Sequence, residues 1–148
     1  MTQLPPTSIP ALAWGAATDT GRVRSENEDM FVAQPMVFAV ADGMGGHQAG
    51  EIASAIAAST LNDRLGGGAA SVDVAVAAVV EANAAIFQGA HTNVDQRGMG
   101  TTLTAMVVLA DQGGGARLAV LNVGDSRTYV MRNGRLRRVT VDHSYVQE

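Results

Sequence analysis

The chain has 148 residues, of which 47% are hydrophobic and 16% are charged, and its formal net charge is −4. This length fits one domain that can bury a hydrophobic core. The negative charge argues against nucleic acid as a partner, because binding to a phosphate backbone depends on clustered cations. The sequence contains no cysteine, which excludes disulfides and cysteine nucleophiles and favours a cytoplasmic location.

The N-terminal region is predicted to be a flexible arm over residues 1–12, followed by a domain over residues 13–148. Three of the four prolines lie in the first ten residues, where the sequence shows no periodic apolar pattern. This stretch also lacks the basic start and the apolar segment of a secretory signal. We therefore expect ordered structure to begin near Ala13.

Three short strands are expected next, at residues 14–18, 30–33 and 36–41. The last of these is an apolar run, which is typical of a buried strand. Asp42 would then stand at the end of that strand. The polar connection over residues 22–29 would lie beside Asp42 if the strands pair.

Two helices are predicted in the middle of the chain. Apolar residues spaced three and four apart from Ala49 to Leu65 indicate a helix that ends at the glycines 66–68. Ser71 is the predicted N-cap of a second helix. The inner face of this second helix is expected to carry Val72, Ala75, Val76, Val79, Ala82 and Ile86. No apolar run approaches the roughly 20 residues that span a bilayer, so we expect no membrane contact.

The C-terminal part of the chain is predicted to return to strands, at residues 101–109, 118–123, 128–131 and 135–140. Asn133-Gly134 indicates a two-residue hairpin turn, because both residues tolerate positive φ. Strands, then two helices, then more strands favour an α+β layered fold over alternating βαβ units.

Carboxylates stand at three of the predicted strand–loop junctions. Asp42 is followed by three glycines in four residues, and the other two junctions carry Glu28-Asp29 and Asp125. Mg²⁺ and Mn²⁺ prefer oxygen ligands, which these carboxylates and the Gly43 carbonyl could supply. Without a cation, crowded carboxylates would repel each other and raise each other's pKa values. For Asp42 taken alone, an ordinary strand-to-turn junction is the alternative interpretation.

A metal site of this kind suits the hydrolysis of a phosphate ester. Two cations that share Asp42 would hold a water molecule as an acidic nucleophile for attack on phosphorus. Arg24 is the candidate phosphate clamp, because a guanidinium binds phosphate oxygens in bidentate fashion. His47 would either donate a proton or hydrogen bond near the site or cap the following helix. Ser126 and Arg127 are expected to brace the turn that positions Asp125, and direct catalysis is the less favoured alternative. The glycine-rich segment matches neither the Walker nor the dinucleotide-binding pattern.

Together these motifs resemble one known family, the metal-dependent serine/threonine protein phosphatases of the PPM type (type 2C), in their bacterial form. The resemblance extends from about Trp14 to the end of the chain, and its motifs stand in the family's order. They are residues 18–24 and 27–29, the segment 40–47 with Asp-Gly-Met-Gly-Gly-His, Gly-Thr-Thr at 100–102, Gly-Asp-Ser-Arg at 124–127, Tyr129, and residues 132–134 and 140–144.

The resemblance implies a four-layer αββα sandwich, in which two antiparallel sheets are flanked by helices. It also implies, for a complete domain, a site for two or three Mn²⁺ or Mg²⁺ ions. The implied reaction is hydrolysis of phosphoserine and phosphothreonine on proteins that serine/threonine kinases have modified. In the family, residues matching Asp42 and the Gly43 carbonyl bind metal directly, and those matching Glu28-Asp29 act largely through water. The residue matching Arg24 meets the phosphate, and the one matching Asp125 serves a third metal.

Members of this family continue well beyond the position of Glu148, with further strands, a helix and two more metal-binding aspartates. We therefore expect a fold that is incomplete at its C-terminus, half of a metal site, and an exposed core surface through which the chain could associate with itself. Two alternatives stay open. One is a non-catalytic module that binds phosphoproteins and keeps a weak cation site, and the other is a half enzyme completed by strand exchange with a second copy.

Overall fold

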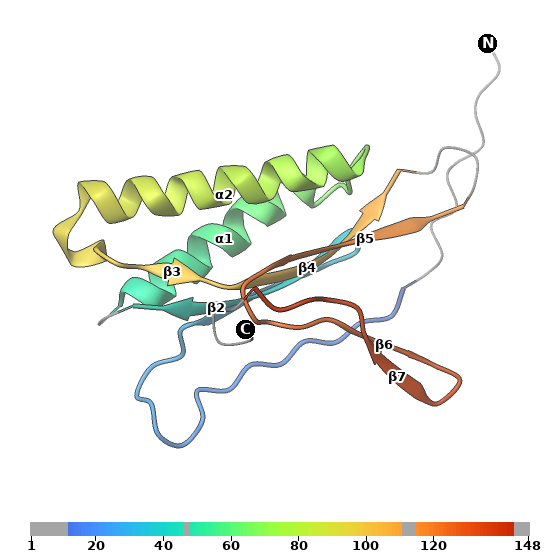
Figure 1. Ribbon diagram of the computed structural model, residues 1–148, viewed down its shortest axis with the longest axis horizontal. Helices are drawn as coiled ribbons and strands as arrows, with labels where there is room; N and C mark the ends of the chain where they lie inside the picture. The colour runs from blue at the N-terminus through green and yellow to red at the C-terminus, as the bar shows by residue number, and fades with distance from the viewer. Residues whose placement is uncertain (1–11, 46–47, 111–114, 144–148) are drawn as a thin grey trace, which may run out of the picture.

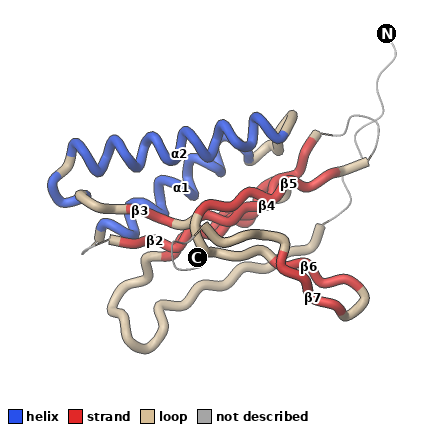
Figure 2. The backbone as a smooth tube through the Cα atoms, viewed as in Figure 1, coloured by secondary structure: helices blue, strands red, loops and turns tan. Residues whose placement is uncertain are grey.

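Two helices cover one face of an antiparallel sheet, and a separate hairpin follows the sheet in the chain (Figure 1; Figure 2). The computed structural model describes residues 12–45, 48–110 and 115–143. The main sheet contains β1 (Asp29–Gln34), β2 (Val37–Met44), β4 (Leu103–Leu109) and β5 (Arg117–Val123) in that order, with the short β3 (Gly100–Thr101) paired to β2. The other elements are α1 (Ala49–Leu65), α2 (Val72–Thr92), the 3-10 helix η1 (Val94–Gln96), and the hairpin strands β6 (Tyr129–Arg132) and β7 (Arg135–Arg138).

The order of elements confirms the predicted α+β class. Every strand pair of the main sheet is antiparallel, and both helices lie between β2 and β3 in the chain. Of the expected αββα sandwich, the described residues form one sheet and the helical layer on it. Among these residues, the β6–β7 hairpin forms a separate sheet of two strands.

Strands β1 and β2 form where the sequence predicted them and pair as neighbours. Successive residues of β2 alternate between the buried helix side and the opposite, outer side of the sheet, as a half-covered strand should. The strand runs on to Met44, because Gly43 and Met44 pair with β3. Asp42 therefore lies within a strand on its outer side, and the expectation that it ends the strand is wrong.

The prediction of a strand at residues 14–18 is also wrong, since the described chain before β1 contains no strand. Gly15 and the two alanines that follow it have little β-propensity. Trp14 instead contacts Phe38 edge to face, with the ring centroids 5.6 Å apart, a favoured aromatic geometry. This contact places the N-terminal segment against the outer side of the sheet.

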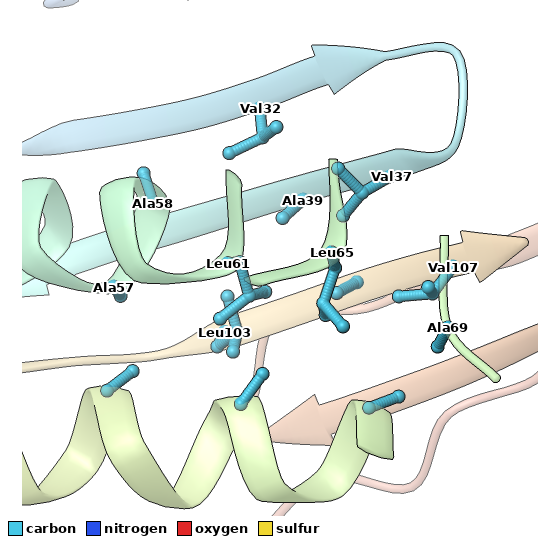
Figure 3. Close-up of a cluster of buried hydrophobic side chains, with 14 of the residues drawn as sticks. Val32, Val37, Ala39, Ala57, Ala58, Leu61, Leu65, Ala69, Leu103 and Val107 are labelled. Carbon is cyan, nitrogen blue, oxygen red and sulfur yellow. The ribbon is translucent and has the colours of Figure 1, made fainter. Parts of the chain in front are cut away.

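The core lies between the sheet and the two helices (Figure 3). Leu61 and Leu65 of α1 are fully buried against Val37 of β2 and Val107 of β4. Many of the other core residues on both helices are alanines. Truncation of a buried leucine such as Leu61 to alanine would cost about 2–5 kcal/mol, so this pair anchors the layer that positions β2.

Helix α2 begins where the sequence predicted, but it turns a different face toward the core. The Ser71 hydroxyl accepts a hydrogen bond from the Val74 backbone N–H at 3.3 Å, which confirms the predicted N-cap. The buried residues of α2 are all alanines: Ala75, Ala78 and Ala82. Val72 and Val76, expected on the inner face, are exposed, because the close approach of the helix to its neighbours selects small side chains on its inner side.

Helix α2 also corrects the expectation that no apolar run could span a bilayer. With 21 residues it is long and apolar enough to do so by length and composition alone. Core helices of soluble proteins can be equally long and apolar, although only 17% of the apolar 18-residue stretch of α2 is buried here. Figure 1 shows α2 lying along α1, and the ion pair of Arg64 with Glu81 joins the two helices.

The outer side of the sheet carries exposed apolar side chains, as expected. Phe31, Val40, Leu118 and Val120 are each between 40% and 48% exposed. Patches of this kind often mark surfaces that another layer or partner covers. Self-association through this side stays a prediction.

The β6–β7 hairpin turns at Asn133-Gly134, as predicted. Both residues have positive φ, 52° and 72°, which is the signature of the favoured two-residue hairpin turn. Arg132, Arg135 and Arg137 are exposed on this hairpin.

Candidate metal and phosphate site

Asp29 and Asp42 lie directly opposite each other in the β1–β2 ladder. Opposed residues of an antiparallel pair have Cβ atoms about 5 Å apart on one face, so the two carboxylates share the outer side of the sheet. Burial raises the pKa of Asp42, and the charge of Asp29 and a hydrogen bond with its side chain raise it further. The charge of Arg24 lowers this pKa, and that of Asp125 raises it. The structure thus brings three other predicted site residues, Asp29, Arg24 and Asp125, within electrostatic reach of Asp42.

Gly43 allows the end of β2 to pass very close to the start of α1. Its backbone N–H donates to the Glu28 carbonyl at 3.2 Å. A Cβ at Gly43 would lie 2.6 Å from that carbonyl oxygen and closer still to the Gly50 carbonyl. A Cβ at Gly50 would in turn lie 2.6 Å from the Glu28 carboxylate. Glycine at both positions is therefore a steric requirement of the site, independent of any unusual φ.

Glu28 and Arg24 form an ion pair, with Arg24 Nη1 2.6 Å from Glu28 Oε2. The Ser54 hydroxyl donates to the Glu28 carbonyl at 2.6 Å, which ties the segment before β1 to α1. The Glu28 side chain is 15% exposed, whereas that of Arg24 is 68% exposed. Arg24 is therefore oriented by a carboxylate while most of its guanidinium stays open to an incoming anion.

The backbone of Asp42 is held by two threonines that lie about 60 positions later in the chain. The Thr101 hydroxyl donates to the Asp42 carbonyl at 3.0 Å, and the Thr102 backbone N–H donates to the same oxygen at 2.9 Å. The Asp42 N–H donates to the Thr102 hydroxyl at 3.3 Å, and this hydroxyl pairs with that of Ser126 at 2.5 Å. A chain of hydrogen bonds thus links the Gly-Asp-Ser-Arg turn to Asp42.

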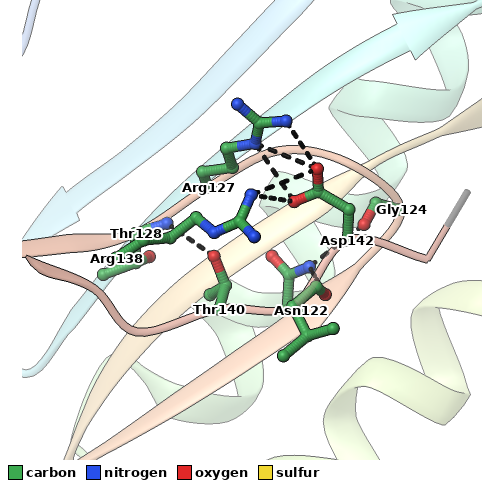
Figure 4. Close-up of polar contacts among 8 residues, drawn as sticks. Asn122, Gly124, Arg127, Thr128, Arg138, Thr140 and Asp142 are labelled. Atoms are coloured by element: carbon green, nitrogen blue, oxygen red, sulfur yellow. Dashed lines mark hydrogen bonds and ion pairs between the residues drawn. The ribbon is translucent and has the colours of Figure 1, made fainter. Parts of the chain in front are cut away.

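Arg127 braces the same turn from its other side (Figure 4). Its Nε and Nη2 atoms donate to the carboxylate of Asp142, with a shortest distance of 2.6 Å, and Arg138 Nη1 donates to that carboxylate at 3.2 Å. The His143 backbone N–H donates to the Gly124 carbonyl at 2.9 Å. The segment after β7 therefore closes over the turn that carries Asp125.

The Asp142 carboxylate is almost completely enclosed, since its side chain is 1% exposed. The hydrogen bond from Arg127 is the largest cause that lowers its pKa below the ordinary value, and the charges of Arg127 and Arg138 lower it further. The same hydrogen bond raises the pKa of Arg127. Both groups are therefore ionised under all physiological conditions, as a structural ion pair requires.

The oxygen donors near Asp42 fit part of a site for a hard cation. The raised pKa of Asp42 beside Asp29 shows carboxylates that a divalent cation would stabilise in their charged form. Across the described ranges, however, no group of three or more His, Cys, Asp or Glu side chains is gathered closely enough to hold a metal by itself. The catalytic role predicted for His47 falls outside the described residues, and the individual site roles stay predictions.

A groove of about 1400 Å³ extends away from Asp42 and Arg24. One wall is the segment before β1 together with the end of β2, and the other is the connection around η1. Its apolar lining includes Val23, Met44 and Val94, all of them strongly exposed. Such a volume exceeds what a phosphate group alone would occupy, so the groove has room for a peptide segment beside it.

Comparison with known proteins agrees with this geometry. The sequence profile of the family Protein phosphatase 2C matches residues 23–148. The chain is 42% identical to serine/threonine protein phosphatase PstP of Mycobacterium tuberculosis and 40% identical to serine/threonine phosphatase stp of Listeria welshimeri. It also resembles the crystal structure of the PstP catalytic domain in complex with two manganese ions, with a TM-score of 0.77 and 39% identity. The chain therefore belongs to the protein phosphatase 2C (PPM) family, whose bacterial members are metal-dependent serine/threonine phosphatases.

The matched region is the N-terminal catalytic portion of these relatives. The two alignments cover 92% and 88% of this chain, but 26% of PstP and 54% of the Listeria phosphatase. The structural match covers 87% of this chain and 55% of the PstP catalytic domain. The chain thus spans about half of the length of that domain.

The sequence analysis did not predict the role of Thr101 and Thr102. Their hydroxyls and backbone hold Asp42 in place. The available signal was their position directly after Gly100 in a Gly-Thr-Thr motif. Ser54 was missed as well, because a serine within an alanine-rich helix gives no indication of its partner.

Proposed function

We propose that this protein hydrolyses phosphoserine and phosphothreonine esters on cytoplasmic proteins, with Mn²⁺ or Mg²⁺ bound at the Asp29–Asp42 pair. The observation that carries the proposal is the opposed placement of these carboxylates beside the exposed guanidinium of Arg24. Membership of the family supports the reaction class. The manganese ions in the PstP structure support the choice of metal.

In this proposal the chain's own residues bind and orient. The Asp42 carboxylate and the Gly43 carbonyl hold the cations directly, Asp29 and Glu28 act largely through water, and Asp125 serves a third ion. A divalent cation supplies positive charge that keeps the carboxylates ionised and acts as a Lewis acid toward a phosphate oxygen. Arg24, aligned by Glu28, clamps the phosphate through its fork of N–H donors.

The groove beside Arg24 supports a polypeptide substrate over a small phosphate ester. A phosphorylated residue at Arg24 would place its neighbours against Met44 and Val94, which are exposed in the free protein. Burial of such apolar side chains by a peptide is favourable by about 25 cal/mol per Å² removed from water. The partners proposed are therefore phosphorylated proteins.

The test is phosphate release from a phosphothreonine peptide by the full chain with Mn²⁺. We expect turnover that EDTA abolishes and that Asp42→Asn lowers at least 100-fold. Arg24→Gln should raise KM more than it lowers kcat, because it removes a contact made by the bound phosphate. Arg22→Gln is the matched control, since Arg22 is an exposed arginine outside the groove lining. Wild-type protein that binds Mn²⁺ and peptide without turnover would overturn the proposal.

A non-catalytic module that binds phosphoproteins is the second candidate. It is favoured by one observation, that no cluster of three or more acidic or imidazole side chains able to hold a metal is found among the described residues. Such a module would bind the phosphate through Arg24 and a cation weakly through Asp42. Calorimetry separates the two candidates, because the module binds a phosphopeptide that remains intact after prolonged incubation with Mn²⁺, whereas the enzyme consumes it.

A further inference from the structure

The side of α2 that faces away from α1 and the sheet is apolar over nearly its whole length. The inner side is defined by the buried Ala75, Ala78 and Ala82. At 100° per residue, the opposite side carries Val76, Ala77, Val80, Ala84 and Phe87, and all five are exposed. Val80 and Phe87 are 61% and 64% exposed. We call these five residues the α2 outer face.

An acidic residue and a basic residue mark the two ends of the α2 outer face. Asp73 lies in the first turn of the helix and His91 in the last, and both project on the same side as Val80. Eighteen residues separate them, which is about 27 Å along the helix. His91 Nδ1 donates to the Phe87 carbonyl at 2.8 Å, and its ring packs against that of Phe87 at a tilt of 39°, with centroids 4.1 Å apart. The imidazole is therefore held in place with its Nε2 edge directed away from this bond.

This pattern of charge and size is complementary to itself in the antiparallel direction. A two-fold axis beside residue 82 would set Asp73 of one copy against His91 of the other. The same axis sets the large Phe87 against the small Ala77, and Val80 against Ala84. Antiparallel helices also bring the positive end of one helix dipole beside the negative end of the other. Symmetric homodimers use self-complementary patches of this kind.

We propose that a second copy of this chain docks on the α2 outer face, forming a two-fold symmetric dimer through antiparallel α2 helices. The pairing of an acidic end with a basic end argues for this occupant over a lipid surface. Helix α2 contains no lysine or arginine, and its acidic residues are Asp73 and Glu81. Helices that bind anionic membranes instead carry basic residues on their polar side, and the chain as a whole has a net charge of −4.

One helix face makes a small interface, so the dimer is expected to dissociate on dilution. Analytical ultracentrifugation of the full chain over a range of concentrations measures its dissociation constant. Val80→Asp should raise this constant at least 10-fold, because it puts a carboxylate at the centre of the interface. Val74→Asp is the matched control, since Val74 is an exposed valine of α2 that projects to another side. It should leave the constant within about two-fold of wild type.

Charge reversal distinguishes the antiparallel arrangement from other modes of association. Asp73→Arg should weaken the dimer several-fold, and adding His91→Glu to it should restore most of the affinity, because the two ends then attract again. Circular dichroism checks that each variant is folded. The dimer proposal is overturned by a wild-type chain that stays monomeric throughout. A second result would also overturn it. In that case the chain associates, Val80→Asp leaves the association intact, and Val120→Asp on the outer side of the sheet abolishes it. Flotation of a monomeric chain with phosphatidylglycerol vesicles would assign the face to lipid.

Discussion

Asp29 and Asp42 face each other across the β1–β2 ladder, and burial together with the neighbouring charge of Asp29 raises the pKa of Asp42. A carboxyl pKa that is raised in the folded state means that the ionised pair opposes folding at neutral pH. The same opposition prepares the pair for a cation, since a divalent ion would remove the repulsion. The opposed carboxylates therefore lower the stability of the metal-free protein.

Asp29→Asn should therefore stabilise the metal-free chain while weakening its response to metal. We expect the free energy of unfolding to rise by about 0.5 kcal/mol, the order of a like-charge pair removed from directly opposed positions. Mn²⁺ should raise the melting temperature of the wild type and raise that of the variant much less. Differential scanning fluorimetry with and without Mn²⁺ measures both effects. Asp63→Asn, at an exposed position of α1, is the control and should change neither.

Thr102→Val should show whether Thr102 supports Asp42 specifically or only stabilises the fold as a whole. The variant removes the acceptor for the Asp42 N–H and the partner of the Ser126 hydroxyl, which should cost roughly 1–3 kcal/mol. It should also weaken Mn²⁺ binding about 10-fold, because the Asp42 backbone loses a support. Thr104→Val is the matched control. The Thr104 hydroxyl pairs with the Thr128 hydroxyl at 2.8 Å, and each of these residues lies two positions after its counterpart in the Thr102–Ser126 pair.

Calorimetric titration with Mn²⁺ compares the two threonine variants. Thr104→Val should lose stability while keeping the affinity of the wild type. Equal losses of affinity in both variants would show that the threonines act only through stability, and would contradict a specific role of Thr102.

Local periodicity predicted much of the fold, and the errors have physical causes. The i, i+3 and i+4 spacing located α1 well, and adjacency in the chain was enough to expect that residues 22–29 approach Asp42. The bracing by Thr102 could not be found in this way, because it joins residues 60 positions apart. The face of α2 was misjudged at Val72 and Val76, since hydrophobicity favours valine inside whereas close packing of the helices selects Ala75, Ala78 and Ala82.

Gly43→Ala should be strongly destabilising although it adds a single methyl group. The new Cβ would clash with the backbone carbonyl groups of Glu28 and Gly50. Rotation of a side chain cannot move these groups out of the way. We expect a loss of roughly 3 kcal/mol, at the upper end of the usual cost of overpacking. Urea unfolding followed by circular dichroism measures it.

Gly67→Ala provides the comparison, because a Cβ at Gly67 would meet nothing within 4 Å and the backbone there has no unfavourable φ. It should be neutral or slightly stabilising. If Gly43→Ala were tolerated equally well, the end of β2 and the start of α1 would have to lie further apart than the structure places them.

Asp142→Asn should make the fold less dependent on pH in the acidic range at and below the ordinary carboxyl pKa. The pKa of Asp142 is lowered in the folded state, so its ionised form adds stability that is fully present above the ordinary carboxyl pKa and lost as the pH falls through the lowered value. The variant lacks this contribution at neutral pH and so has less to lose in acid. Thermal unfolding of both proteins across this pH range measures the difference.

The two arginines that bind Asp142 should contribute unequally to stability. Arg127→Gln should lower the melting temperature more than Arg138→Gln, because Arg127 donates through two nitrogens at distances down to 2.6 Å, whereas Arg138 donates through one at 3.2 Å or more. Arg137→Gln, on the exposed hairpin, should have little effect. The reverse order of the first two variants would mean that the hairpin arginine, and not the turn arginine, holds the Asp142 carboxylate.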